Sequence, residues 1–156
     1  MEAKTLGYMA DLFEKAKRDQ FALCDTLESI ADSLPHSIDR QTCIHTAKAL
    51  GNVIQSAHQI EEELIFPYLE TRILSIRDPQ ATFDRLRLEH AGDEFAAEEV
   101  IEVLLSLGRN DPIQSSEATG YMLRGFFDNL RRHIAFEQEI LGAALVQALA
   151  EGNAPH

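Results

Sequence analysis

Three copies of one spaced pair, His-x-x-x-Glu, are the residues of this sequence that could do chemistry. The pairs are His58 with Glu62, His90 with Glu94, and His133 with Glu137. Because residues four apart in an α-helix lie on one face, each copy would present an imidazole beside a carboxylate. Imidazole nitrogen and carboxylate oxygen together suit iron, zinc or manganese. The pattern therefore predicts a metal site, provided that helices bring the three pairs together.

The three pairs also lie on the apolar stripes that the predicted helices would turn toward one another. A charged carboxylate in an apolar core is costly unless a counter-charge or a metal answers it. A single pair would be interpreted as a surface contact or a satisfied core histidine, but three pairs on three helices favour metal binding. Two divalent ions would nearly neutralise three carboxylates. A carboxylate-rich set favours iron or manganese over structural zinc.

Four long segments with helical periodicity must position the pairs, and no segment shows the alternation of a β-strand. We expect helices over residues 6–34, 39–75 and 78–108, and a fourth that begins between 112 and 117. Pro67 should kink the second helix, because it removes one backbone donor. Short connections favour antiparallel neighbours. The prediction is an all-α fold, an antiparallel up-down-up-down four-helix bundle over residues 1–151, with a disordered tail over 152–156.

The composition limits the classes of partner that this bundle could bind. The chain has 156 residues, enough for one domain, and a formal net charge of −12 from 14 basic and 26 acidic residues. This charge disfavours nucleic acid and anionic membranes, both of which need a basic face. There is no apolar stretch of membrane-spanning length and no signal peptide at the N-terminus. We therefore expect a cytoplasmic protein in which Cys24 and Cys43 are reduced, buried thiols.

The neighbours of the pairs separate two kinds of helical metal protein. Ferritin-like di-iron proteins place Glu three residues before His. At that position this sequence carries Gln55, Arg87 and Leu130, so the ferritin-like pattern is absent. The acidic residues Glu61 and Asp93, next to the pairs, are expected to point sideways or outward.

The sequence resembles the hemerythrin-like (HHE cation-binding) family over nearly its whole length. The resemblance is carried by HQIEEELIFP at 58–67, EHAGDE at 89–94 and MLRGFFDNLRRHIAFE at 122–137. It implies a bundle that holds two bridged irons, with zinc or manganese as alternatives. It also implies the ligands: His58, His90 and His133 match terminal histidines, Glu62 and Glu137 match bridging carboxylates, and Glu94 matches the second ligand of the third helix.

One departure from the family bears on the number of metals. The family also takes a histidine from the first helix, and this sequence has none before Pro35. The matching position is Lys17 or Gln20, of which we favour Lys17. A cationic lysine cannot ligate and would oppose a nearby metal. The site would then hold two metals with one undercoordinated, hold one metal, or hold none, with Lys17 neutralising a carboxylate; we expect the first.

The function implied by the resemblance is the binding of oxygen or another small diatomic such as nitric oxide, in sensing, storage, iron homeostasis or stress response. A second hypothesis is a metal-poor bundle that acts as a helical interaction or regulatory protein. A third is an enzyme, a peroxidase or a nitric oxide reductase. No nucleophile motif, phosphate loop or dinucleotide fingerprint occurs, so the sequence favours a binding protein over an enzyme.

Overall fold

The computed structural model describes residues 2–72 and 76–152, and this part of the chain is helical, with no β-strand. Its elements are α1 (Glu2–Asp32), α2 (Arg40–Gln59), the π-helical segment η1 (Ile60–Ile65), α3 (Phe66–Glu70), α4 (Pro79–Arg109), α5 (Ser116–Glu137), the π-helical segment η2 (Gln138–Gly142) and α6 (Ala143–Gly152). Because α2, η1 and α3 are continuous, as are α5, η2 and α6, the chain forms four rods. The predicted all-α class is confirmed.

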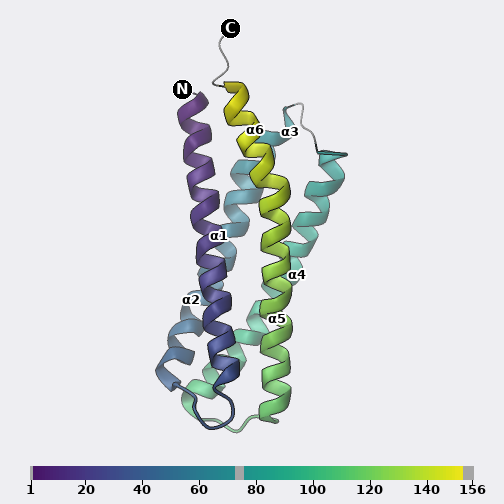
Figure 1. Cartoon of the computed structure of the whole chain (residues 1–156). Coiled ribbons are helices and arrows are strands. Elements are labelled where there is room, and N and C mark those ends of the chain that lie inside the picture. The colour runs from purple at the N-terminus through teal and green to yellow at the C-terminus, as the bar shows by residue number, and fades with distance from the viewer. Residues whose placement is uncertain (1, 73–75, 153–156) are drawn as a thin grey trace.

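Figure 1 shows the four rods side by side, with consecutive rods running in opposite directions. The connection from α1 to α2 lies at the foot of the bundle, and α3 ends and α4 begins at its head. α1 contacts α2 and α5, and α4 contacts the same two helices, so α1 and α4 lie at opposite corners. None of the described helices is long and apolar enough to cross a membrane.

Local sequence signals account for where the helices begin. The Asp39, Asp78 and Ser115 side chains each accept a hydrogen bond from a backbone N–H in the first turn of the helix that follows, at 3.1, 3.2 and 2.9 Å. Pro67 is the second residue of α3 and directly follows the π-helical segment η1, so it has no N–H to donate to the preceding turn of the rod. The structure has the π-helical segment η1 just before this proline, and the predicted kink of the rod stays a prediction. The second rod ends at Glu70. Of the predicted disordered tail over 152–156, Gly152 is the last residue of α6, whereas residues 153–156, like residues 73–75, lie outside the described part.

The core consists of two apolar clusters separated by a polar layer. The foot cluster includes Leu27, Leu50, Leu104 and Leu123 together with the unpaired, buried Cys24 and Cys43. The head cluster includes Leu6, Phe13, Phe66, Phe83 and Leu145. Between them lies the polar layer, whose buried members are Lys17, Gln20, His58, Glu61, His90, Asp93, His133 and Glu137. All four rods therefore contribute polar side chains at the same height of the bundle.

Candidate metal centre

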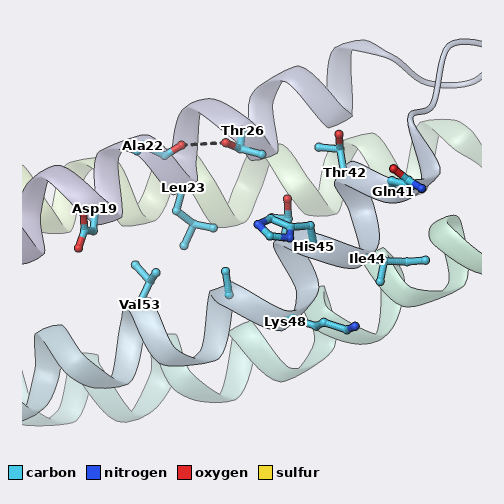
Figure 2. A pocket seen from close by; sticks show the side chains of 12 residues that line it. Asp19, Ala22, Leu23, Thr26, Gln41, Thr42, Ile44, His45, Lys48 and Val53 are labelled. Atoms are coloured by element: carbon cyan, nitrogen blue, oxygen red, sulfur yellow. Dashed lines mark hydrogen bonds between the residues drawn. The ribbon is translucent and has the colours of Figure 1, made fainter.

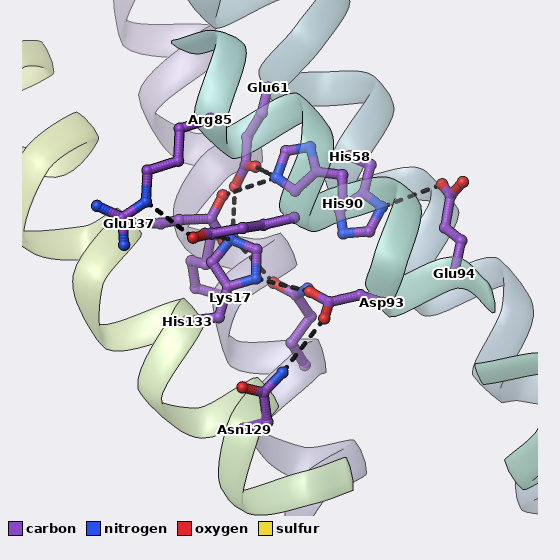
Figure 3. A network of polar contacts seen from close by, with 12 residues as sticks. Lys17, His58, Glu61, Arg85, His90, Asp93, Glu94, Asn129, His133 and Glu137 are labelled. Atoms are coloured by element: carbon purple, nitrogen blue, oxygen red, sulfur yellow. Dashed lines mark hydrogen bonds and ion pairs between the residues drawn. The ribbon is translucent and has the colours of Figure 1, made fainter. Parts of the chain in front are cut away.

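Two carboxylates, Glu61 from η1 and Glu137 at the end of α5, lie at the centre of the polar layer (Figure 3). Lys17 Nζ forms ion pairs with Oε1 of Glu61 and, at 2.9 Å, with Oε1 of Glu137. His90 Nε2 contacts the other oxygen of each, Oε2 of Glu61 at 2.8 Å and Oε2 of Glu137 at 3.0 Å. Each carboxylate therefore joins the Lys17 side of the layer to the His90 side.

The three histidines of the layer are each oriented by an acidic residue from a neighbouring rod. His58 Nδ1 lies 3.0 Å from Glu94 Oε1, His90 Nδ1 lies 3.0 Å from Glu62 Oε2, and His133 Nδ1 lies 2.6 Å from Asp93 Oδ2. In each contact the carboxylate accepts, so Nδ1 carries the proton. A hydrogen bond of this kind to the outer nitrogen is the usual support of a metal-binding histidine, because it fixes the ring and leaves Nε2 as the ligand atom.

The inner nitrogens show that these residues fit a metal. Nε2 of His58 and Nε2 of His133 are buried and have no hydrogen-bond partner, which is costly for a polar atom in a dry layer. Ligand atoms of His90, His133 and Glu137 lie within 4.8 Å of one another. An ion with bonds of about 2.0–2.2 Å to nitrogen and oxygen holds neighbouring ligand atoms roughly 3 Å apart, so these side chains would close around it. Carboxylate oxygens of Glu89 and Glu137 lie 3.5 and 3.6 Å from His133 Nε2 without forming a hydrogen bond, so a metal would give both nitrogens a partner that they lack.

The structure divides the six predicted ligands into two groups. His58, His90, His133 and Glu137 lie buried in the layer. The side chains of Glu62 and Glu94 are 32% and 41% exposed and contact the outer nitrogens of His90 and His58. These two acids are therefore placed to orient histidines and lie away from the inner nitrogens.

The expectation that Glu61 and Asp93 point sideways or outward is wrong. Glu61 is fully buried between Lys17 and His90, and Asp93 is 7% exposed and bonded to His133. Both acids follow a motif histidine by three residues, and positions i+3 and i+4 share the face of residue i equally well. The sequence does show acids at both positions after His58 and after His90. It does not show which of the two turns inward.

The π-helical segments lie at the two central carboxylates. Glu61 is inside η1, and η2 begins directly after Glu137. A π-turn closes an i→i+5 bond and so holds one residue more than an α-turn, which shifts the phase of the residues that follow. Such bulges are frequent at functional sites, because they place a side chain where a regular helix would not. Here they accompany the carboxylates that join the two sides of the layer.

The cationic groups of the layer are stabilised by these carboxylates. Burial opposes the charge on His90, but hydrogen bonds to Glu137 and Glu61 outweigh it and raise the His90 pKa to about 10. Burial likewise opposes the charge on Lys17, and the negative charges of Glu61 and Glu137 raise its pKa above the ordinary value. In the absence of metal, both groups are therefore charged at neutral pH.

The pKa values of the two central carboxylates, Glu61 and Glu137, are shifted in opposite directions. Burial, with a contribution from neighbouring Glu137, raises the pKa of Glu61 to about 7. Burial acts in the same direction on Glu137, but its contacts with Glu61, His90 and Lys17 hold its pKa well below the usual range. One central carboxylate thus binds a proton near neutral pH even with Lys17 and His90 present. The layer can take more positive charge than its own side chains supply.

A groove of about 780 Å³ between α4 and α5 reaches the layer from the surface. Asp93 and His133 line it, together with Gly92, Gly125 and Phe136. No heavy atom lies within 4 Å of where a Cβ would stand on Gly92 or Gly125, so these glycines leave the groove open. We call this hollow the α4–α5 groove.

A second hollow, of about 790 Å³, lies between α1 and α2 (Figure 2). It is lined by Leu23, His45 and Val53 among others, and by no residue of the polar layer. His45 is exposed there, as is His36 near the foot of the bundle.

A comparison of the sequence with known protein families gives a match that covers the helical bundle and its polar layer. The model of the family described as Hemerythrin HHE cation binding domain matches residues 9–145, which include every residue of the polar layer. No curated protein and no solved structure matches the chain. The family match covers far more than half of the chain. This protein therefore belongs to the hemerythrin family, whose domain is named for cation binding.

Proposed function

We propose that the polar layer binds a transition-metal ion, with iron as the expected metal. His58, His90 and His133 would supply Nε2, and Glu61 and Glu137 would supply carboxylate oxygen. Glu62, Glu94 and Asp93 would orient the histidines, so two of the acids predicted as ligands act here through their neighbours. The observation that carries the proposal is the pair of buried, unpartnered Nε2 atoms of His58 and His133. Family membership supports it independently.

When bound, iron would supply a redox-active Lewis acid able to take a small diatomic such as oxygen or nitric oxide. The chain's own contribution is to position the ligands and to exclude water. The head and foot clusters enclose the layer from both sides, and the side chains of His58 and His90 are only 2% exposed. His133, at 6%, lies in the wall of the α4–α5 groove. A small ligand would therefore approach from the His133 side.

The physiological roles compatible with this proposal are sensing, storage, iron homeostasis and defence against oxidative or nitrosative stress. A second candidate function is supported by Lys17, which already answers the charges of Glu61 and Glu137 without a metal. On that reading the chain is a helical regulatory protein that works through its surface. The two candidates differ in bound metal, so metal content separates them.

The test is the metal content of anaerobically purified protein, followed by its visible spectrum with and without oxygen or nitric oxide. We expect stoichiometric metal in the wild type and loss of most of it in His133→Ala. His45→Ala is the matched control, because His45 is exposed and outside the layer, and it should keep the wild-type content. A colourless wild type without metal would favour the regulatory protein, and full occupancy in His133→Ala would contradict the ligand assignment.

A further inference from the structure

Every N–H donor of the Lys17 ammonium group has a partner within the polar layer. Its residue is fully buried, and an ammonium group has three N–H donors. The three partners are Oε1 of Glu61, Oε1 of Glu137 at 2.9 Å and Oε1 of Gln20 at 3.0 Å. The Phe13 ring lies 5.2 Å from Nζ and adds a cation–π contact. No donor of this group is left for solvent, so the ammonium is a fully paired member of the polar layer.

The Glu61 and Glu137 carboxylates bridge two positions that both attract positive charge. Their Oε1 atoms meet at Lys17 Nζ, and their Oε2 atoms meet at His90 Nε2. The second position has unpartnered histidine nitrogen in the same layer. A metal that binds there can displace the proton from His90 Nε2. The first position has no such ligand: α1 brings only the ammonium and Gln20, whose oxygen is already bonded to it.

We propose that the Lys17 ammonium fills one of the two cation positions between Glu61 and Glu137, so that each chain takes one divalent ion, on the His90 side, and not two. This inference rests on the proposed function. Two carboxylates balanced by one ammonium and one divalent ion leave a single positive charge. A second divalent ion would have to displace the ammonium into an apolar core or bind beside it, and both are unfavourable because the layer excludes water.

The first measurement is the number of metal ions per wild-type chain. Titration of the chelator-treated protein with Mn²⁺ should saturate at one ion, with the electron paramagnetic resonance signal of an isolated ion. A crystal of the iron-loaded protein should show one anomalous peak beside His90, with Lys17 Nζ still between the carboxylates. Two ions per chain, or the signal of a magnetically coupled pair, would overturn the inference and leave the proposed function standing.

The second measurement replaces the ammonium by a neutral ligand. Lys17→His should bind two ions per chain, because it removes the positive charge and adds a nitrogen donor at the same position. Lys15→His is the matched control: Lys15 lies on the exposed face of α1, paired with Asp19, so this variant should still bind one ion. A folded Lys17→His protein that binds one ion would contradict the inference. If wild type and Lys17→His both bind no metal, the proposed function fails as well.

Discussion

Lys17 and Glu137, 120 residues apart in sequence, form an ion pair of 2.9 Å in which both side chains are 1% exposed. The pair joins α1 to the end of α5, and Glu61 joins the second rod to the same ammonium. Such a pair contributes little net stability compared with apolar residues of the same size, because both charges have been taken out of water. A substitution that removes one partner of the pair is strongly destabilising, since it leaves the other charge buried without its counter-charge.

The first prediction concerns that loss. Lys17→Met keeps the length of the side chain and removes the charge, so the Oε1 atoms of Glu61 and Glu137 would lose their cation and His90 would remain as the one cation in contact with both carboxylates. We expect the free energy of unfolding of the metal-free protein to fall by about 3–5 kcal/mol, as is typical when one partner of a buried pair is removed. Urea denaturation of chelator-treated protein measures it. Lys15→Met, on the exposed face, should change the value by well under 1 kcal/mol; equal effects would show that the buried pair is not important.

The second prediction concerns the acids that orient the histidines. Asp93→Asn keeps the size of the side chain but weakens the hydrogen bond that fixes His133 Nδ1, which is 2.6 Å long. We expect metal affinity to fall roughly 10–100-fold, the usual cost of such a change. Competition with a chelator of known affinity measures it. Glu98→Gln, an exposed change on the same helix, serves as the control. Unchanged affinity in Asp93→Asn would show that His133 is not a ligand or needs no support.

Much of this arrangement could be read from the sequence, because helical periodicity is a local property. The positions of His58, His90, His133 and Glu137 relative to the apolar stripes were sufficient to bring them into one layer. The absence of a histidine from the first helix pointed to Lys17 or Gln20, and the structure buries both in the layer. Each of these inferences needs only the spacing of residues within one helix and the assumption that apolar faces meet.

The choice between Glu61 and Glu62 could not be read in the same way. Both follow His58 on nearly the same face, and in the structure Glu61, which lies in the π-helical segment η1, is the one that enters the core. Nothing in the sequence marks a π-turn, because it is selected by tertiary contacts, here those of Glu61 with Lys17 and His90. For the same reason Asp93 was missed: its partner, His133, lies on another helix.

The third prediction concerns pH in the metal-free protein. The pKa of His90 is about 10 in the folded chain against the ordinary histidine value of 6.5, so the stability that its charge contributes is complete below 6.5 and is lost as the pH rises to about 10. Glu61 acts in the same direction between 4.5 and about 7, since the folded state binds its proton more tightly than the unfolded state. We therefore expect Tm to fall as the pH rises from 6.5 toward 10.

Thermal unfolding of chelator-treated protein across this range tests the third prediction. His90→Gln should flatten the upper part of the profile, from about pH 7 to 10, because the titrating group is gone. His36→Gln, an exposed change near the foot of the bundle, should leave the profile as in the wild type. A wild-type Tm that rises or stays level over this range would be incompatible with a charged His90.

The fourth prediction concerns access through the α4–α5 groove. Gly92→Leu should be tolerated by the fold, because no atom lies within 4 Å of the new Cβ, but its side chain would narrow the groove beside His133 and Asp93. We expect the metal content to stay at the wild-type level and the association of nitric oxide with the reduced metal to slow several-fold. Stopped-flow spectroscopy measures this rate. Gly7→Leu, which also meets no atom within 4 Å but lies near the N-terminus of α1, should leave the rate unchanged. An unaltered rate in Gly92→Leu would mean that ligands reach the layer by another route, and an equal slowing in both variants would point to a general effect of the added leucine.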